Sequence, residues 1–184
     1  DFVTVVRALA EEPVVAVFEL NVSCPNVGAG GVEFGADETV LADLVRRARD
    51  ATDRPLVVKL SPALPDPARL AACAAAAGAD GFTAVNTLPA FADNPDGATS
   101  RLGRGPGGLS GPPLLPVGVR ITKLVVAATG LPVIGTGGVR TGRDALRYLA
   151  AGASLVGVGT AALADPRAPE RIVRELAALL EVGA

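Results

Sequence analysis

The feature that most constrains the fold is a strict alternation of short, valine-rich apolar runs with longer segments of helical periodicity. The apolar runs cover residues 14–20, 55–60, 81–85, 131–134 and 155–158. A short, uninterrupted apolar run between turn residues predicts a strand that is buried on both faces, as strands of a parallel sheet are. The intervening segments predict the crossover helices that parallel strands require. We therefore predict an α/β fold with one parallel sheet.

Helix start signals support the same alternation. Asp37 is placed to cap a helix, Asp66 or Pro67 to open a second, and Thr141 to cap a third over residues 144–151. The helix after Asp37 has an apolar face made of Val40, Leu41, Leu44, Val45 and Ala48. The helix that Asp66 or Pro67 opens runs through residues 70–77, residues 121–128 lie in another helix, and residues 170–180 predict a closing amphipathic helix.

Two folds fit this pattern, a doubly wound sheet and a (β/α)8 TIM barrel. A complete barrel needs about 250 residues, whereas this chain has 184 residues and five predicted strand–helix units. The chain also begins with Asp1, not Met, inside a helical pattern. We expect residues 1–184 to be a single barrel domain that lacks its amino-terminal part and contains units 4–8 only.

Composition excludes several classes of function. The net charge of −2 and the 3% aromatic content argue against partners such as nucleic acid or an anionic membrane surface. The chain has no histidine, which excludes a Ser-His-Asp triad, and its two cysteines lack metal-ligand spacing, so we expect no metal site. Two isolated thiols favour a reducing, cytoplasmic location, and no apolar run reaches the ~20 residues of a membrane span.

The loops after the last two predicted strands indicate a phosphate site. Gly137 and Gly138 follow one strand, and Gly159 and Thr160 follow the next. Successive glycines let backbone N–H groups approach an anion closely. A single glycine pair could equally be a simple turn, but barrel enzymes often bind phosphate after strands seven and eight. This count makes the first strand seen here number four, which favours the barrel.

Polar residues also follow the other predicted strands. Lys59 lies within an apolar strand, where it needs an anionic or polar partner unless it extends to the surface. Cys24 lies in a polar loop, whereas Cys73 lies among alanines and is interpreted as core packing. Residues 88–111 are rich in Gly, Pro and Asp without periodicity, and we interpret them as a lid over the site.

Several motifs in order resemble the dihydroorotate dehydrogenase family. They are Glu19-Leu20-Asn21-Val22-Ser23-Cys24-Pro25-Asn26, Val58-Lys59-Leu60-Ser61-Pro62, Val85-Asn86-Thr87, Gly107-Gly108-Leu109-Ser110-Gly111-Pro112, Gly135-Thr136-Gly137-Gly138 and Gly159-Thr160. The glycine motif is weak alone, and the cysteine segment is strong. The resemblance implies a flavoenzyme of pyrimidine biosynthesis that oxidises dihydroorotate to orotate.

The resemblance also implies a role for each matching residue. Cys24 corresponds to the base that takes a proton from carbon 5 while carbon 6 delivers hydride to flavin N5. Lys59 corresponds to the lysine beside the isoalloxazine of FMN, and Asn21 to a residue near both flavin and substrate. The remaining substrate contacts correspond to Asn26, Asn86 and Thr87. The remaining FMN contacts correspond to Val85, Gly111, Gly137, Gly138, Gly159 and Thr160.

The subclass suggested by the resemblance is class 1B. Cysteine as the base is typical of soluble class 1 enzymes, and Ser61-Pro62 together with the Gly-Gly-Leu-Ser-Gly motif is more like class 1B than the fumarate-using class 1A. Class 1B implies an iron–sulfur and FAD partner subunit that passes electrons to NAD. Ala63 departs from the asparagine common there. We also expect a homo-oligomer, and we expect the 184 residues alone to be inactive.

Other functions remain open from sequence. A dihydropyrimidine dehydrogenase domain shares the cysteine loop and would act on uracil or thymine. A non-catalytic FMN-binding half-barrel would keep the glycines without turnover. An aldolase or isomerase barrel would explain the glycines but not the Asn-x-Ser-Cys-Pro-Asn segment.

Overall fold

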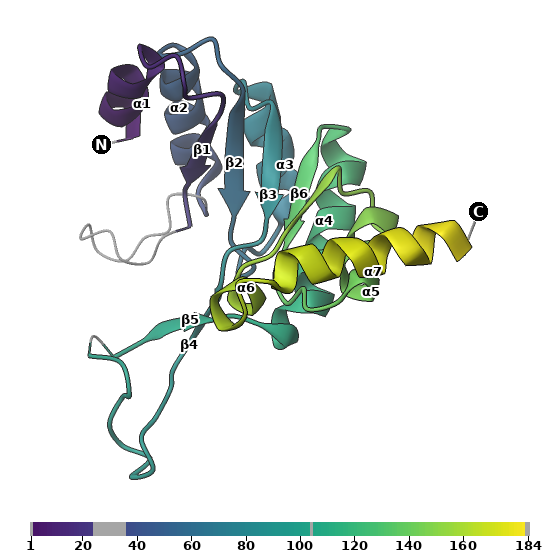
Figure 1. Cartoon of the computed structure of the whole chain (residues 1–184). Coiled ribbons are helices and arrows are strands. Elements are labelled where there is room, and N and C mark those ends of the chain that lie inside the picture. Colours follow the sequence, from purple (N-terminus) through teal and green to yellow (C-terminus); the bar gives the residue numbers. More distant parts are fainter. Residues whose placement is uncertain (1, 24–35, 104, 183–184) are drawn as a thin grey trace.

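A central parallel sheet organises the molecule. The computed structural model describes residues 2–23, 36–103 and 105–182. The sheet contains β1 (Phe18–Asn21), β2 (Leu56–Leu60), β3 (Gly81–Ala84), β6 (Val133–Thr136) and β7 (Leu155–Gly157), in that spatial order. Every pair of neighbours is parallel, so the predicted parallel α/β sheet is confirmed. Figure 1 shows the curved sheet with helices packed along it.

The helices connect the strands as the alternation predicts. They are α1 (Phe2–Ala10), α2 (Glu38–Arg49), α3 (Pro67–Ala76), α4 (Leu115–Thr129), α5 (Gly142–Ala150), α6 (Thr160–Ala164) and α7 (Ala168–Val182), with a short 3-10 helix, η1 (Pro112–Leu114), before α4. The Asp37 side chain accepts hydrogen bonds from the backbone N–H groups of Thr39 and Val40, and Thr141 forms a capping box with Asp144. Asp66 likewise accepts a hydrogen bond from the Arg69 N–H at the start of α3, so all three predicted helix starts are confirmed.

The predicted start of the first strand is wrong. The apolar run predicts a strand over residues 14–20, whereas β1 covers Phe18–Asn21. Val14 is 86% exposed and Val17 is 50% exposed, so these two valines contribute little to the core. A strand needs a hydrogen-bonding neighbour, and β1 is in register with β2 only from Phe18 onward.

The hydrophobic core is divided into two clusters. The larger one packs β1, β2 and β3 against α2, α3 and α4, and every residue of β3 is buried. The smaller one is centred on Tyr148 between α5 and α7. The expectation that every strand is buried on both faces is wrong for β7, where Leu155 is 62% exposed. Here β7 lies at an edge of the sheet and pairs with β6 alone.

The segment between Asn86 and Leu115 is more ordered than predicted. It contains the antiparallel pair β4 (Leu88–Ala90) and β5 (Gly107–Leu109), and Asp93 and Ser100 form a further bridge. The Asp96 carboxylate accepts hydrogen bonds from the backbone N–H groups of Ala98 and Thr99 and stabilises the turn. In Figure 1 this arm points away from the sheet, so a lid closed over the site is not the conformation seen.

Helices long and apolar enough to span a lipid bilayer are absent from the described residues.

Candidate active site

The carboxyl ends of β2, β3, β6 and β7 meet around one cavity of about 370 Å³, whereas Asn21 at the end of β1 does not line it. Parallel strands end at the same edge of a sheet, so the loops after them converge there. Of the residues that the sequence predicts to bind cofactor or substrate, nine line this cavity: Lys59, Val85, Asn86, Thr87, Gly111, Gly137, Gly138, Gly159 and Thr160. The structure therefore brings together residues separated by up to about half of the chain.

The glycine loop after β6 has the shape of an anion cradle. Gly137 and Gly138 have φ angles of +116° and +76°, which favour glycine strongly. A Cβ on Gly138 would lie 2.7 Å from the Leu115 nitrogen and 2.9 Å from the Gly111 carbonyl oxygen. A Cβ on Gly159 would meet nothing within 4 Å, so open space faces this residue. These residues fit a phosphate group held by the backbone.

Tyr148 of α5 stabilises the glycine loop after β6. Its buried hydroxyl lies 2.9 Å from the carbonyl oxygen of Thr136 and 2.8 Å from that of Gly137. Gly118 and Gly135 leave room for the ring, because a Cβ at either position would collide with it. Burial raises the pKa of Tyr148, so the phenol stays protonated and acts as a donor. Sequence reasoning missed this residue, although it is the only tyrosine in the chain.

Removing this hydroxyl is expected to loosen the loop. Tyr148→Phe should lower the free energy of unfolding by about 1–2 kcal/mol, because the part-buried Gly137 carbonyl loses the donor that Tyr148 provides. Urea denaturation of the full-length protein measures this. Thr122→Val is the matched control, since the buried Thr122 hydroxyl has no hydrogen-bond partner among the described residues. Equal losses in the two variants would contradict the role given to the Tyr148 hydroxyl.

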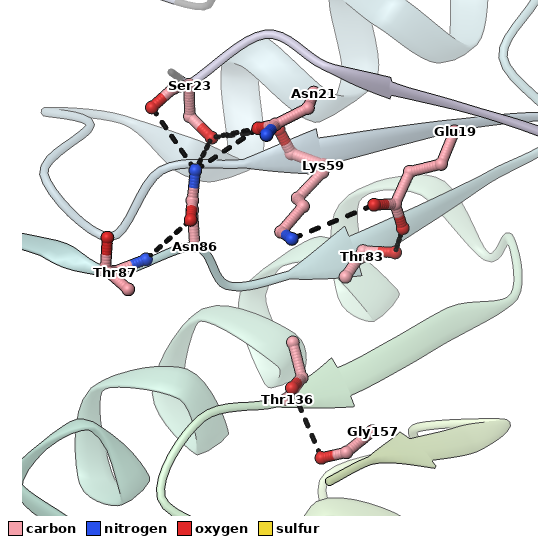
Figure 2. A network of polar contacts seen from close by, with 9 residues as sticks. All are labelled: Glu19, Asn21, Ser23, Lys59, Thr83, Asn86, Thr87, Thr136 and Gly157. Atoms are coloured by element: carbon pink, nitrogen blue, oxygen red, sulfur yellow. Dashed lines mark hydrogen bonds and ion pairs between the residues drawn. The ribbon is translucent and has the colours of Figure 1, made fainter. Parts of the chain in front are cut away.

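Two side-chain amides, of Asn21 and Asn86, and the Ser23 hydroxyl form a network at the carboxyl ends of β1 and β3. The Asn86 side-chain amide donates to Ser23 Oγ at 2.8 Å and faces Asn21 Oδ1 at 3.2 Å. The Ser23 hydroxyl in turn donates to Asn21 Oδ1 at 3.2 Å, and Asn86 Oδ1 accepts from the Thr87 N–H. Figure 2 shows these side chains together. Ser23 is a site residue to which sequence reasoning assigned no role.

Lys59 meets a carboxylate. It is the second-last residue of β2 and is in register with Asn21 of β1 and Thr83 of β3. Its ammonium lies 3.8 Å from a carboxylate oxygen of Glu19, and its side chain is 26% exposed. Of the two alternatives left open for this lysine, a charged partner or extension to the surface, the structure thus shows a charged partner, Glu19.

Two predicted site residues, Cys24 and Asn26, lie outside the described residues. Ser23, directly before Cys24, belongs to the amide network, so the chain enters this segment at the site. The other cysteine, Cys73, is half-buried on α3 and packs against the larger core cluster. Its interpretation as a packing residue is consistent with this position.

The family model for dihydroorotate dehydrogenase matches residues 1–180. The chain belongs to the dihydroorotate dehydrogenase family. The resemblance drawn from the motifs is thus confirmed.

Curated relatives include both subclasses named above. A Solibacter usitatus protein with the provisional name dihydroorotate dehydrogenase A (fumarate) is 46% identical over 98% of this chain and 60% of its own length. The catalytic subunit of dihydroorotate dehydrogenase B (NAD(+)) from Cutibacterium acnes is 44% identical over 98% of this chain and 59% of its own length. The chain thus spans about 60% of the length of these relatives.

A solved structure confirms the barrel prediction. The crystal structure of DHODH in complex with ferulenol from Eimeria tenella matches with a TM-score of 0.82 and 24% sequence identity. It is matched over 100% of this chain and 54% of its own chain. The fold is therefore part of a TIM barrel, as the count of strand–helix units predicts.

Proposed function

We propose that the full-length protein is an FMN-dependent enzyme that oxidises dihydroorotate to orotate in pyrimidine biosynthesis. The observation that carries this is the convergence of a glycine cradle, a lysine and an amide network on one cavity. Family membership supports the same reaction.

FMN fits the residues on either side of this cavity. Gly137, Gly138, Gly159 and Thr160 would hold the phosphate, and Val85 and Gly111 would contact the flavin. Thr160 already orients its hydroxyl toward Ser110 Oγ at 3.0 Å. Bound FMN would supply the hydride acceptor. The Lys59 cation, on the same cavity wall, would stabilise negative charge on the reduced ring.

The substrate would be held by the amides. A planar pyrimidine offers carbonyl oxygens and N–H groups in its plane, and asparagine amides complement both. Asn21 and Asn86 are preorganised by their shared contacts with Ser23, and we assign Asn26 and Thr87 to the same surface. Cys24 would take the proton from carbon 5 as its thiolate.

Further parts of the proposal concern the assembly. We propose a single FMN-binding barrel domain in a cytoplasmic homo-oligomer. A class 1B enzyme would work with an iron–sulfur and FAD subunit, and one relative is named as the catalytic subunit of a type B enzyme. Steady-state assays with NAD and with fumarate distinguish this from class 1A.

Anaerobic titration of the full-length protein tests the function. A yellow preparation that dihydroorotate bleaches at one equivalent would support the proposal. Bleaching by dihydrouracil instead would favour a dihydropyrimidine dehydrogenase. Bound flavin that neither compound reduces would favour a non-catalytic FMN-binding module, and no flavin spectrum would refute all three.

Residues 1–184 by themselves are expected to retain no stoichiometric FMN and to be poorly soluble. In the described structure β1 and β7 are both unpaired edges of the sheet, and open edges promote association. The flavin absorbance and the size-exclusion profile of the purified 184-residue chain measure this. A yellow, monomeric preparation would contradict the expectation.

A further inference from the structure

Glu19 is a charged residue that the proposed function leaves unused. One carboxylate oxygen accepts a hydrogen bond from the Thr83 hydroxyl at 2.5 Å, and the other lies 3.8 Å from the Lys59 ammonium. Figure 2 shows Glu19 joined to both side chains, with Lys59 lying between Glu19 and the amides of Asn21 and Asn86. Within the described part of the chain it is the only carboxylate in ion-pair contact with Lys59.

The strand register determines where the Glu19 carboxylate lies. Side chains two residues apart on a strand point to the same face, so Glu19 shares the face of Asn21 on β1. Lys59 is in register with Asn21 on one side and with Thr83 on the other. Lys59 and Thr83 share one row of the register, and Glu19 lies two residues before that row on the same face of the sheet.

The hydrogen bond to Thr83 fixes the distance between the charges. A carboxylate on a free side chain would lose much of its effect by moving into solvent. Glu19 is held by a short hydrogen bond, and its side chain is 39% exposed beside a lysine that is 26% exposed. Its field at the lysine is therefore only partly screened by water.

We propose that Glu19 is a positioning residue that holds the Lys59 ammonium and offsets part of its charge at the flavin. The inference rests on the proposed function, in which Lys59 lies beside FMN. A cation there stabilises the anionic reduced flavin, and a carboxylate paired with the cation weakens that stabilisation. Glu19 thus lowers the reduction potential of bound FMN through Lys59.

The reduction potential of bound FMN tests this directly. Glu19→Gln keeps the size of the side chain and an acceptor for Thr83, but removes the charge. Anaerobic dye-coupled titration of the full-length protein should show a more positive midpoint potential with unchanged FMN stoichiometry. Glu19→Asp keeps the charge on a shorter side chain and should shift the potential less in the same direction.

The control is Glu38→Gln. Glu38 is a carboxylate on α2 paired with Arg69 at 2.6 Å, away from the cavity-lining residues, and its loss should leave the potential unchanged. An unchanged or more negative potential in Glu19→Gln would overturn the inference. If Glu19→Gln does not fold, the midpoint potential of Glu19→Asp is the test. A more positive potential would support the inference, and an unchanged or more negative one would overturn it.

The two proposals fail separately. If the wild-type protein binds FMN and dihydroorotate reduces it, while Glu19→Gln has the wild-type potential, only the inference about Glu19 is wrong. If the wild-type protein binds no flavin, the proposed function fails and the role of Glu19 fails with it.

Discussion

Replacing Cys24 with serine in the full-length protein is expected to leave FMN bound and to slow its reduction by dihydroorotate by orders of magnitude near neutral pH. A thiol has an ordinary pKa of about 8.5, whereas a serine hydroxyl is a far weaker acid and supplies almost no base near pH 7. Cys24 directly follows Ser23, whose hydroxyl belongs to the amide network that is proposed to bind the substrate. Anaerobic stopped-flow measurement of flavin bleaching gives the rate.

The pH dependence of the same rate adds a second readout. The base acts when deprotonated, so the wild-type rate should rise with pH through the thiol's apparent pKa and then level off. The rate for Cys24→Ser should keep rising at higher pH. Cys73→Ser is the matched control, because Cys73 is half-buried on α3 and packs against the core. Wild-type kinetics in Cys24→Ser would remove Cys24 from the mechanism.

Gly138→Ala is expected to abolish tight FMN binding, with an affinity loss of at least about tenfold. The φ of +76° strains any side chain, at about 1–3 kcal/mol. The new methyl would also press on the backbone of Leu115 and Gly111 at 2.7 and 2.9 Å. Relief requires the loop to move, and the N–H groups that are proposed to bind the phosphate would move with it. Fluorescence titration with FMN measures the affinity.

Gly97→Ala separates backbone strain from cofactor binding. Gly97 has a similar φ of +67° at the tip of the arm, where a Cβ would meet nothing within 4 Å. We expect comparable strain in a denaturation experiment but unchanged FMN affinity. Equal FMN affinity in Gly138→Ala and wild type would contradict the phosphate role of this loop.

Much of the fold could be predicted because its signals are local. Capping at Asp37 and Thr141 depends on residues two or three positions away, and helical periodicity repeats within a few residues. The wrong strand start at Val14 has a different origin. An apolar run shows where burial is possible, but pairing with β2 decides where the strand begins.

The candidate site was predicted in part for a similar reason. Parallel topology brings strand ends together, so the glycines, Lys59 and Asn86 could be assigned to one cavity without knowing any distance. Tyr148 was missed because its role depends on how α5 packs beneath the loop after β6. A buried tyrosine in an amphipathic helix has the same pattern as any core residue.

The order of strands and helices, the edge of the sheet that carries the candidate site and the family follow from the amino-acid pattern, because periodicity and motif spacing lie along the chain. The pairing of Glu19 with Lys59 and Thr83 does not. Residues 19 and 83 are separated by 64 positions, and only the register between three neighbouring strands brings their side chains into contact. Register is set by packing across the whole sheet, so the pairing of the Glu19 carboxylate with Lys59 could be identified only from the tertiary structure.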